Sequence, residues 1–173
     1  MTVNTEHQVE HEILVNAEPA TVYRLIAEVE NWPRIFPPTI HVDHLERGES
    51  EERIRIWATA NGAAKSWTSR RVLDSDVLSI GFRQEVSTPP VASMAGTWII
   101  EPVSAQASRV RLLHDYRAVD DDPEGLAWID QAVDRNSTSA QPAYQVSGWN
   151  ASTAAARTLV SGASSTTKRT SST

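Results

Sequence analysis

The stretch that decides the fold reads EERIRIWATANGAAKSWTSRRVL and occupies residues 51–73. Residues 51–60 and 64–73 follow the two-residue alternation that is typical of strands. Asn61-Gly62 lies between them and is the strongest short signal for a two-residue hairpin turn, because both residues tolerate the positive φ that such a turn needs. The stretch therefore predicts two adjacent antiparallel strands.

Further strands are predicted on both sides of this hairpin. Turn residues separate them, for example Asp74-Ser75-Asp76 and Pro89-Pro90. The seven predicted strands are residues 8–16, 40–47, 51–60, 64–73, 78–87, 95–102 and 109–118. The last six should form an antiparallel meander, with residues 8–16 pairing at an edge.

Helical patterns interrupt and follow the strands. Pro19 favours the first turn of a helix, and apolar residues at helical spacing continue to Val29. Asn31-Trp32-Pro33 should end this helix, because a residue that precedes proline avoids the helical region. A short helical turn over Pro33–Phe36 is predicted next.

Residues 123–160 read as one long helix. Its inward stripe begins with large apolar residues and continues with small or polar ones, including Asn136 and Ala140. Pro142 should kink or break the helix, because proline removes a backbone hydrogen bond. We expect residues 1–160 to form one domain and the Ser/Thr-rich residues 161–173 to be a disordered tail.

Composition excludes several classes of protein. The chain of 173 residues has no cysteine, so it has no disulfide and no cysteine-based metal or nucleophile site. The formal net charge of −6 argues against nucleic-acid binding, which needs clustered Lys and Arg. No signal peptide or membrane-spanning run is evident, so we expect a soluble cytoplasmic protein without a membrane partner. The histidines show no ligand spacing, so no metal site is expected.

Two chemically active side chains fall on apolar strand faces. Arg71 shares its face with Trp67 and Ser69, and His114 shares its face with Tyr116. An arginine and an imidazole that face an aromatic-lined interior indicate a pocket. Two structural alternatives remain open: Arg71 could pair with a carboxylate, and His114 could be a core histidine that bonds to the backbone or to the hydroxyl of Tyr116.

The order of the predicted elements is a strand, two short helices, a six-stranded meander and a long helix. This is the order of the helix-grip fold, an α+β fold in which a curved antiparallel sheet wraps one long helix. A cavity lies between sheet and helix in that fold, and small residues on the helix stripe would leave it unfilled.

Six segments resemble one known family: Ile35-Phe-Pro-Pro-Thr39, Ser66-Trp-Thr-Ser-Arg-Arg71, Phe82-Arg-Gln-Glu85, Met94-Ala-Gly-Thr-Trp98, Leu113-His-Asp115 and Asp134-Arg-Asn-Ser137. Together they resemble the bacterial aromatase/cyclases of type II polyketide synthases, which are START-like helix-grip proteins. The resemblance spans roughly residues 7–150. The first two segments resemble the single-domain branch, which closes the first ring between carbons 7 and 12.

The resemblance implies a substrate, a reaction and a set of site residues. The substrate would be a linear poly-β-ketone thioester on an acyl carrier protein, and the reaction an aldol cyclisation followed by dehydration, without a cofactor. Arg71 would stabilise the enolate or alkoxide, and His114 would transfer protons. The substrate-binding residues implied are Trp67, Ser69, Gln84, Trp98, Phe36, Thr39, Tyr116, Asn136 and Ala140.

One position departs from the family pattern. The branch carries an aspartate four residues after the asparagine of its Arg-Asn-Ser motif, where this chain has Ala140. A non-catalytic carrier of lipid, quinone or polyketide with the same fold is therefore the alternative function. Other expected partners are components of a type II synthase, with the protein itself a monomer or homodimer. Arg34, Arg70 and Arg83 are candidates for docking an acidic carrier protein.

Overall fold

The computed structural model describes residues 6–139 and 165–171 of the chain. In chain order the elements are β1 (His7–Val15), α1 (Pro19–Ala27), η1 (Val29–Asn31), α2 (Trp32–Ile35), β2 (Thr39–Arg47), β3 (Glu51–Ala60), β4 (Ala63–Asp74), β5 (Ser79–Val86), β6 (Val91–Ser104), β7 (Ala107–Ala118), η2 (Val119–Asp121), α3 (Pro123–Ser139) and β8 (Ser165–Ser171). All seven predicted strands and both short helices are present, and their ends shift by at most a few residues.

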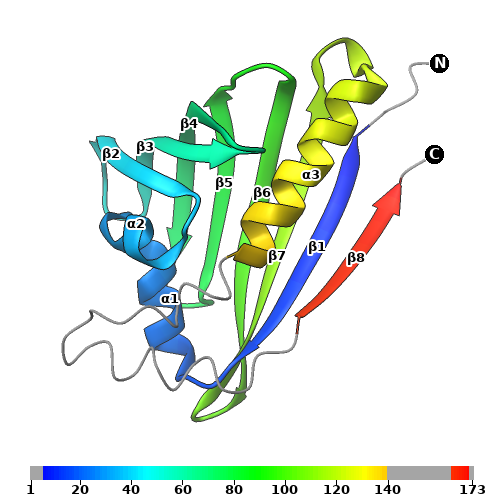
Figure 1. Cartoon of the computed structure of the whole chain (residues 1–173). Helices are drawn as coiled ribbons and strands as arrows, with labels where there is room; N and C mark the ends of the chain where they lie inside the picture. The colour runs from blue at the N-terminus through cyan, green and yellow to red at the C-terminus, as the bar shows by residue number, and fades with distance from the viewer. Residues whose placement is uncertain (1–5, 140–164, 172–173) are drawn as a thin grey trace.

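The strands form one antiparallel sheet in the order β2-β3-β4-β5-β6-β7-β1-β8. Figure 1 shows α3 lying across the sheet in front of β6 and β7 and α2 lying beside β2, while α1 packs against β6 and β7. The predicted helix-grip arrangement is therefore confirmed. Among the described residues, no helix is long and apolar enough to cross a membrane.

The hairpin between β3 and β4 forms at the predicted place. Asn61 and Gly62 both have positive φ, at 50° and 81°, as a two-residue hairpin turn requires. The amide nitrogen of the Asn61 side chain also donates a hydrogen bond of 2.9 Å to the backbone oxygen of Trp128. The turn thus ties the edge of the meander to α3.

The end of the chain differs from expectation. Residues 165–171, predicted as part of a disordered tail, form β8 and pair with β1 over His7–Ile13. The physical reason is that β1 would otherwise present a row of unpaired N–H and C=O groups, and the threonines of this segment favour extended backbone. The part of the predicted long helix beyond Ser139, including Ala140 and Pro142, lies outside the described residues.

Three apolar clusters hold the sheet and helices together. One joins α1 to β5, β6 and β7 around Ile26 and Ile80. A second joins α3 to β1 and β7 around Ile129 and Tyr116, and a third surrounds Ile54 on β3. The central residues of these clusters are fully buried, so the sheet and α3 form rigid walls on either side of the space between them.

Candidate active site

A cavity of about 180 Å³ lies between the inner face of the sheet and α3. Because one water occupies about 30 Å³ in the liquid, this space suits an organic ligand better than a single water. The lining residues come from every layer of the fold: Trp32, Phe36, Pro38, Thr39, Ile56, Ala58, Ala60, Lys65, Trp67, Gln84, Thr88, Val91, Met94, Trp98, Leu112, His114, Trp128, Ile129, Ala132, Val133, Asn136 and Ser137.

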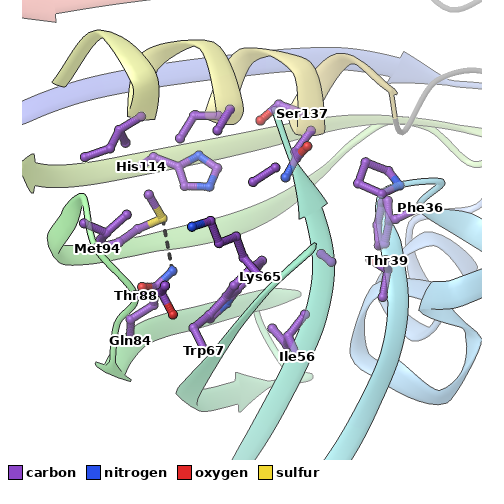
Figure 2. A pocket seen from close by; sticks show the side chains of 18 of the residues that line it. Phe36, Thr39, Ile56, Lys65, Trp67, Gln84, Thr88, Met94, His114 and Ser137 are labelled. Atoms are coloured by element: carbon purple, nitrogen blue, oxygen red, sulfur yellow. Dashed lines mark hydrogen bonds between the residues drawn. The ribbon is translucent and has the colours of Figure 1, made fainter. Parts of the chain in front are cut away.

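Seven of the predicted site residues are brought together in this lining. They are Phe36, Thr39, Trp67, Gln84, Trp98, His114 and Asn136. The aromatic ones form flat apolar walls, since Phe36 lies between the rings of Trp32 and Trp98 at centroid distances of 5.3 and 5.9 Å. Figure 2 shows Phe36 and Thr39 on one side of the cavity and His114, Met94 and Gln84 on the other.

His114 projects into the cavity from the middle of β7 (Figure 2). Its ring packs edge-on against Phe82, with 5.5 Å between ring centroids. Its Nδ1 is buried and has no hydrogen-bond partner among the described residues. Loss of water around the ring, and secondarily the nearby His11, lower the pKa of the His114 imidazole to about 3. The side chain is therefore neutral at physiological pH.

His11 is a neighbour of His114 for which no role was predicted. It lies on β1 opposite Leu112, and its Nε2 is 3.1 Å from Oδ1 of Asp134 on α3. The alternation of apolar residues through β1 placed His11 on the inward face, but the carboxylate comes from a helix more than a hundred positions away. A contact of that kind leaves no signal in local periodicity.

Arg71 is buried but does not line the cavity. Its Nη1 donates to Oε1 of Glu52 at 2.7 Å, and its Nη1 and Nη2 donate to the backbone oxygens of Ala27 and Ile26. Burial lowers the pKa of the guanidinium to about 10, against the opposing effect of Glu52. The structure thus adopts the alternative in which Arg71 pairs with a carboxylate, and corrects the expectation that it faces the cavity.

Arg71 packs against the outer side of one cavity-lining residue, Trp32. Its guanidinium carbon is 5.2 Å from the ring centroid of Trp32, whose indole nitrogen donates to the backbone oxygen of Ile26. The side chains of Arg71 and Trp32 therefore both bind the end of α1, and Arg71 also holds the ring of Trp32 in place. Arg71 is a positioning residue in this arrangement.

Two further predicted lining residues also lie outside the cavity. Ser69 is buried in β4 beside Arg71. Tyr116 is fully buried in the cluster beneath α3, and its hydroxyl donates to a carboxylate oxygen of Asp130 rather than to His114. Alternation assigned the correct face to both residues, but the cavity occupies only part of that face. Ala140 lies outside the described residues.

Polar groups in the lining are few and partly engaged. The Gln84 side chain accepts a hydrogen bond of 2.8 Å from the hydroxyl of Ser87 and donates to the sulfur of Met94 at 3.4 Å. The hydroxyl of Thr88 donates to the backbone oxygen of Ser66. These contacts hold Gln84 in place, with its amide pointing into the cavity.

Lys65 is a charged lining residue that was not among the site residues predicted from the sequence. It lies on β4, and its Nζ is 5.7 Å from the ring centroid of Trp128, which was left without a role. A signal was present, because Lys65 precedes Trp67 by two positions and must share its face. Residues 6–139 and 165–171 contain no group of three or more His, Cys, Asp or Glu that could hold a metal ion.

Comparisons with known proteins agree with this geometry. A family model described as "Polyketide cyclase / dehydrase and lipid transport" matches residues 6–140. A bifunctional cyclase/dehydratase of the granaticin polyketide synthase from Streptomyces virginiae is 58% identical over 130 residues, which cover 75% of this chain and 42% of the relative. The chain therefore spans less than half the length of that relative.

Two solved structures are also similar. The di-domain aromatase/cyclase BexL, from the BE-7585A biosynthetic pathway, is 68% identical with a TM-score of 0.69, over 79% of this chain and 44% of BexL. The Zhui aromatase/cyclase from Streptomyces sp. R1128 is 28% identical with a TM-score of 0.76, over 88% of this chain and 94% of Zhui. This chain is thus nearer in sequence to part of a di-domain protein than to Zhui.

Proposed function

The chain belongs to the polyketide cyclase/dehydrase and lipid-transport family, and from this premise we propose that the first ring of a poly-β-ketone is closed and dehydrated in its cavity. The substrate would be held as a thioester on an acyl carrier protein of a type II polyketide synthase. The resemblance to the branch that joins carbons 7 and 12 supports that regiochemistry for the ring closure.

The observation that supports this proposal most directly is that His114 projects into a largely apolar cavity, where burial lowers the pKa of its imidazole. A neutral imidazole can accept a proton from a methylene that lies between two ketones. His114 is a weak base here, so the proton transfer needs a compensating interaction. The enolate that the transfer creates lies beside the new imidazolium and supplies it. The enolate and the imidazolium then attract each other strongly in a cavity of low polarity.

The reaction can be written with all atoms accounted for. His114 removes the methylene proton, and the enolate carbon attacks the carbonyl carbon of a second ketone, which forms one carbon–carbon bond and an alkoxide. The imidazolium returns its proton to the alkoxide. Loss of water from the resulting alcohol, followed by enolisation, gives the aromatic ring without any oxidant or reductant.

The tryptophans supply the shape that this chemistry needs. Trp32, Trp67, Trp98 and Trp128 line the cavity and present flat surfaces to a folded, nearly planar chain. A chain held against such walls has fewer reactive conformations, so fewer pairs of carbons can meet. A bound chain that displaces water from these walls would also protect the enolate from unproductive protonation.

Product analysis tests this function. A minimal type II synthase would run with the chain, without it, and with His114→Ala, and the products would be identified by mass spectrometry and NMR. We expect a new first-ring aromatic product that falls about 100-fold or more with His114→Ala. His41→Ala is the matched control, because His41 is an exposed histidine on β2. An unchanged product mixture, with polyketide still bound, would instead favour a non-catalytic carrier.

A further inference from the structure

We propose that Lys65 is the cation that holds the substrate oxygen on which negative charge develops, the role that the sequence had given to Arg71. This inference rests on the proposed function and adds a residue to it. Lys65 would donate to the ketone oxygen that becomes an enolate or an alkoxide, while His114 moves the proton. It would therefore be a catalytic residue of the cyclisation.

Position is the first argument. Figure 2 shows the Lys65 side chain reaching into the cavity from β4, toward the part of the lining that contains Met94 and His114. Among the described residues, it is the one lysine or arginine in the lining. Arg71, six positions further along the same face, is held by Glu52 and two backbone oxygens and cannot reach a ligand without breaking those bonds.

Charge is the second argument. Several nearby cations are already paired with carboxylates: Arg53 and Arg70 both bind Glu85, and Arg70 also binds Glu51. All 22 Asp and Glu residues of the chain fall between Glu6 and Asp134. Within that described range none forms an ion pair with Lys65, which leaves its ammonium group available to a ligand oxygen.

Fixed placement is the third argument. The ammonium lies 5.7 Å from the centroid of the Trp128 ring, a geometry that favours a positive charge over the ring face. The hydrogen bond from the Asn61 side chain to the backbone oxygen of Trp128 also ties the hairpin that precedes Lys65 to α3. The cation is thus placed before the ligand arrives, as transition-state stabilisation of an oxyanion requires.

The test uses a planar phenol as a stand-in for the enolate. In 4-nitro-1-naphthol the anion absorbs visible light and the neutral form does not, so a pH titration gives the apparent pKa of the bound probe. Binding is followed separately by quenching of tryptophan fluorescence. If Lys65 holds the oxyanion, Lys65→Met should raise the apparent pKa of the bound probe by about one unit, a tenfold loss of preference for the anion.

Two further variants make the comparison sharp. Lys65→Arg keeps a cation and should retain most of the preference for the anion. Lys168→Met, which removes the only other lysine of the chain, should leave the titration unchanged. In the product assay, Lys65→Met should lower formation of the first-ring product about 100- to 1000-fold, and circular dichroism should show that the variant is folded.

Either of two results would overturn the role of Lys65. One is the same apparent pKa of the bound probe in the unaltered protein and in Lys65→Met; the other is no binding of the probe at millimolar concentration. If the chain still forms the ring product through His114, only this inference fails. If the chain forms no ring product but still prefers the bound anion, the proposed function fails and the oxyanion site remains.

Discussion

At the scale of single residues, Arg71 shows how a buried cation can serve a site that it does not enter. It binds Glu52, whose other carboxylate oxygen is 2.9 Å from Nε2 of His44. It also closes the end of α1 by binding the backbone oxygens of Ile26 and Ala27. Loss of activity on replacing Arg71 would therefore have a structural cause that must be separated from catalysis.

The first prediction separates the two causes. Arg71→Met should lower the free energy of unfolding by about 3 kcal/mol or more, because it leaves the Glu52 carboxylate buried without its cation. Adding Glu52→Met in the same chain should restore part of that loss. Urea unfolding followed by tryptophan fluorescence measures both changes.

Arg70→Met is the control for this prediction. Arg70 is partly exposed, and pairs of that kind contribute less than about 1 kcal/mol. If Arg71→Met formed no product yet unfolded like the unaltered protein, the positioning role would be wrong and a direct contact with substrate would be indicated.

The second prediction concerns the pH dependence of stability through His114. Its pKa is about 3 in the folded protein and near 6.5 when unfolded, so between these values the unfolded chain binds more protons. Stability should therefore fall as pH drops from about 6.5 toward 3, by about 1.4 kcal/mol per pH unit from this residue. Above pH 6.5 neither state is protonated there, and the contribution is constant.

His114→Gln should remove that component. We expect the difference in unfolding free energy between this variant and the unaltered protein to shift in favour of the variant as pH is lowered from 6.5 to 4. His41→Gln, at an exposed position on β2, is the comparison variant. A pH-independent difference between His114→Gln and the unaltered protein would mean that the folded imidazole titrates normally.

The sequence predicted correctly which side of the sheet each candidate residue faces. It did not predict which of these residues reach the cavity. Alternation along a strand fixes which side each residue faces, and it placed Trp67 and His114 correctly. It cannot tell whether a side chain at a given height meets the cavity or the packed end of α1. That depends on Glu52 across the register of β3 and β4, which placed Arg71 outside the cavity.

At the scale of elements, the contact between β6 and β7 determines how His114 is held. Gly96 is opposite His114 in the register, and Phe82 is opposite Gly96 on the other side. A side chain at Gly96 would overlap the backbone oxygen of Leu113 and the ring of Phe82. The absence of a Cβ therefore lets β5, β6 and β7 approach closely enough to set the His114 ring against Phe82.

The third prediction follows from this close approach. Gly96→Ala should lower the free energy of unfolding by about 1–3 kcal/mol, because strands or the Phe82 ring must move to accept the methyl group. It should also weaken binding of the naphthol probe by displacing His114. Gly81→Ala on β5 is the matched control, since a Cβ there would meet nothing within 4 Å. Equal effects of the two substitutions would show that the close approach of the strands does not depend on the missing Cβ at Gly96.

Most strands and helices could be predicted from the sequence. The exception is β8, because its formation depends on a distant partner strand. Strand alternation and the Asn61-Gly62 turn are local signals, so the meander could be located from the sequence alone. β8 depends on a partner strand at the opposite end of the chain, and its serines and threonines have no apolar alternation. The sequence of such an edge strand contains little that distinguishes it from an unstructured tail.

At the scale of the whole molecule, surface charge bears on how a carrier protein could approach the cavity. Two of the three arginines proposed for docking, Arg70 and Arg34, differ in their surroundings. Arg70 is neutralised by Glu51 and Glu85, and so it offers little positive charge to a partner. Arg34 is exposed on α2, two residues before Phe36, which lines the cavity. Arg34 is therefore the better placed candidate for docking.

The fourth prediction tests this placement. An acidic carrier protein would be attracted by Arg34, so Arg34→Glu should reduce turnover of carrier-bound substrate, mainly through a higher KM that depends on salt. A soluble thioester analogue without the carrier should be turned over as before, because Arg34 is not among the residues that line the cavity. Arg83→Glu, an exposed reversal on β5, provides the comparison. If both reversals had equal effects, docking would respond to net charge alone; if Arg34→Glu slowed the soluble analogue equally, Arg34 would act within the site.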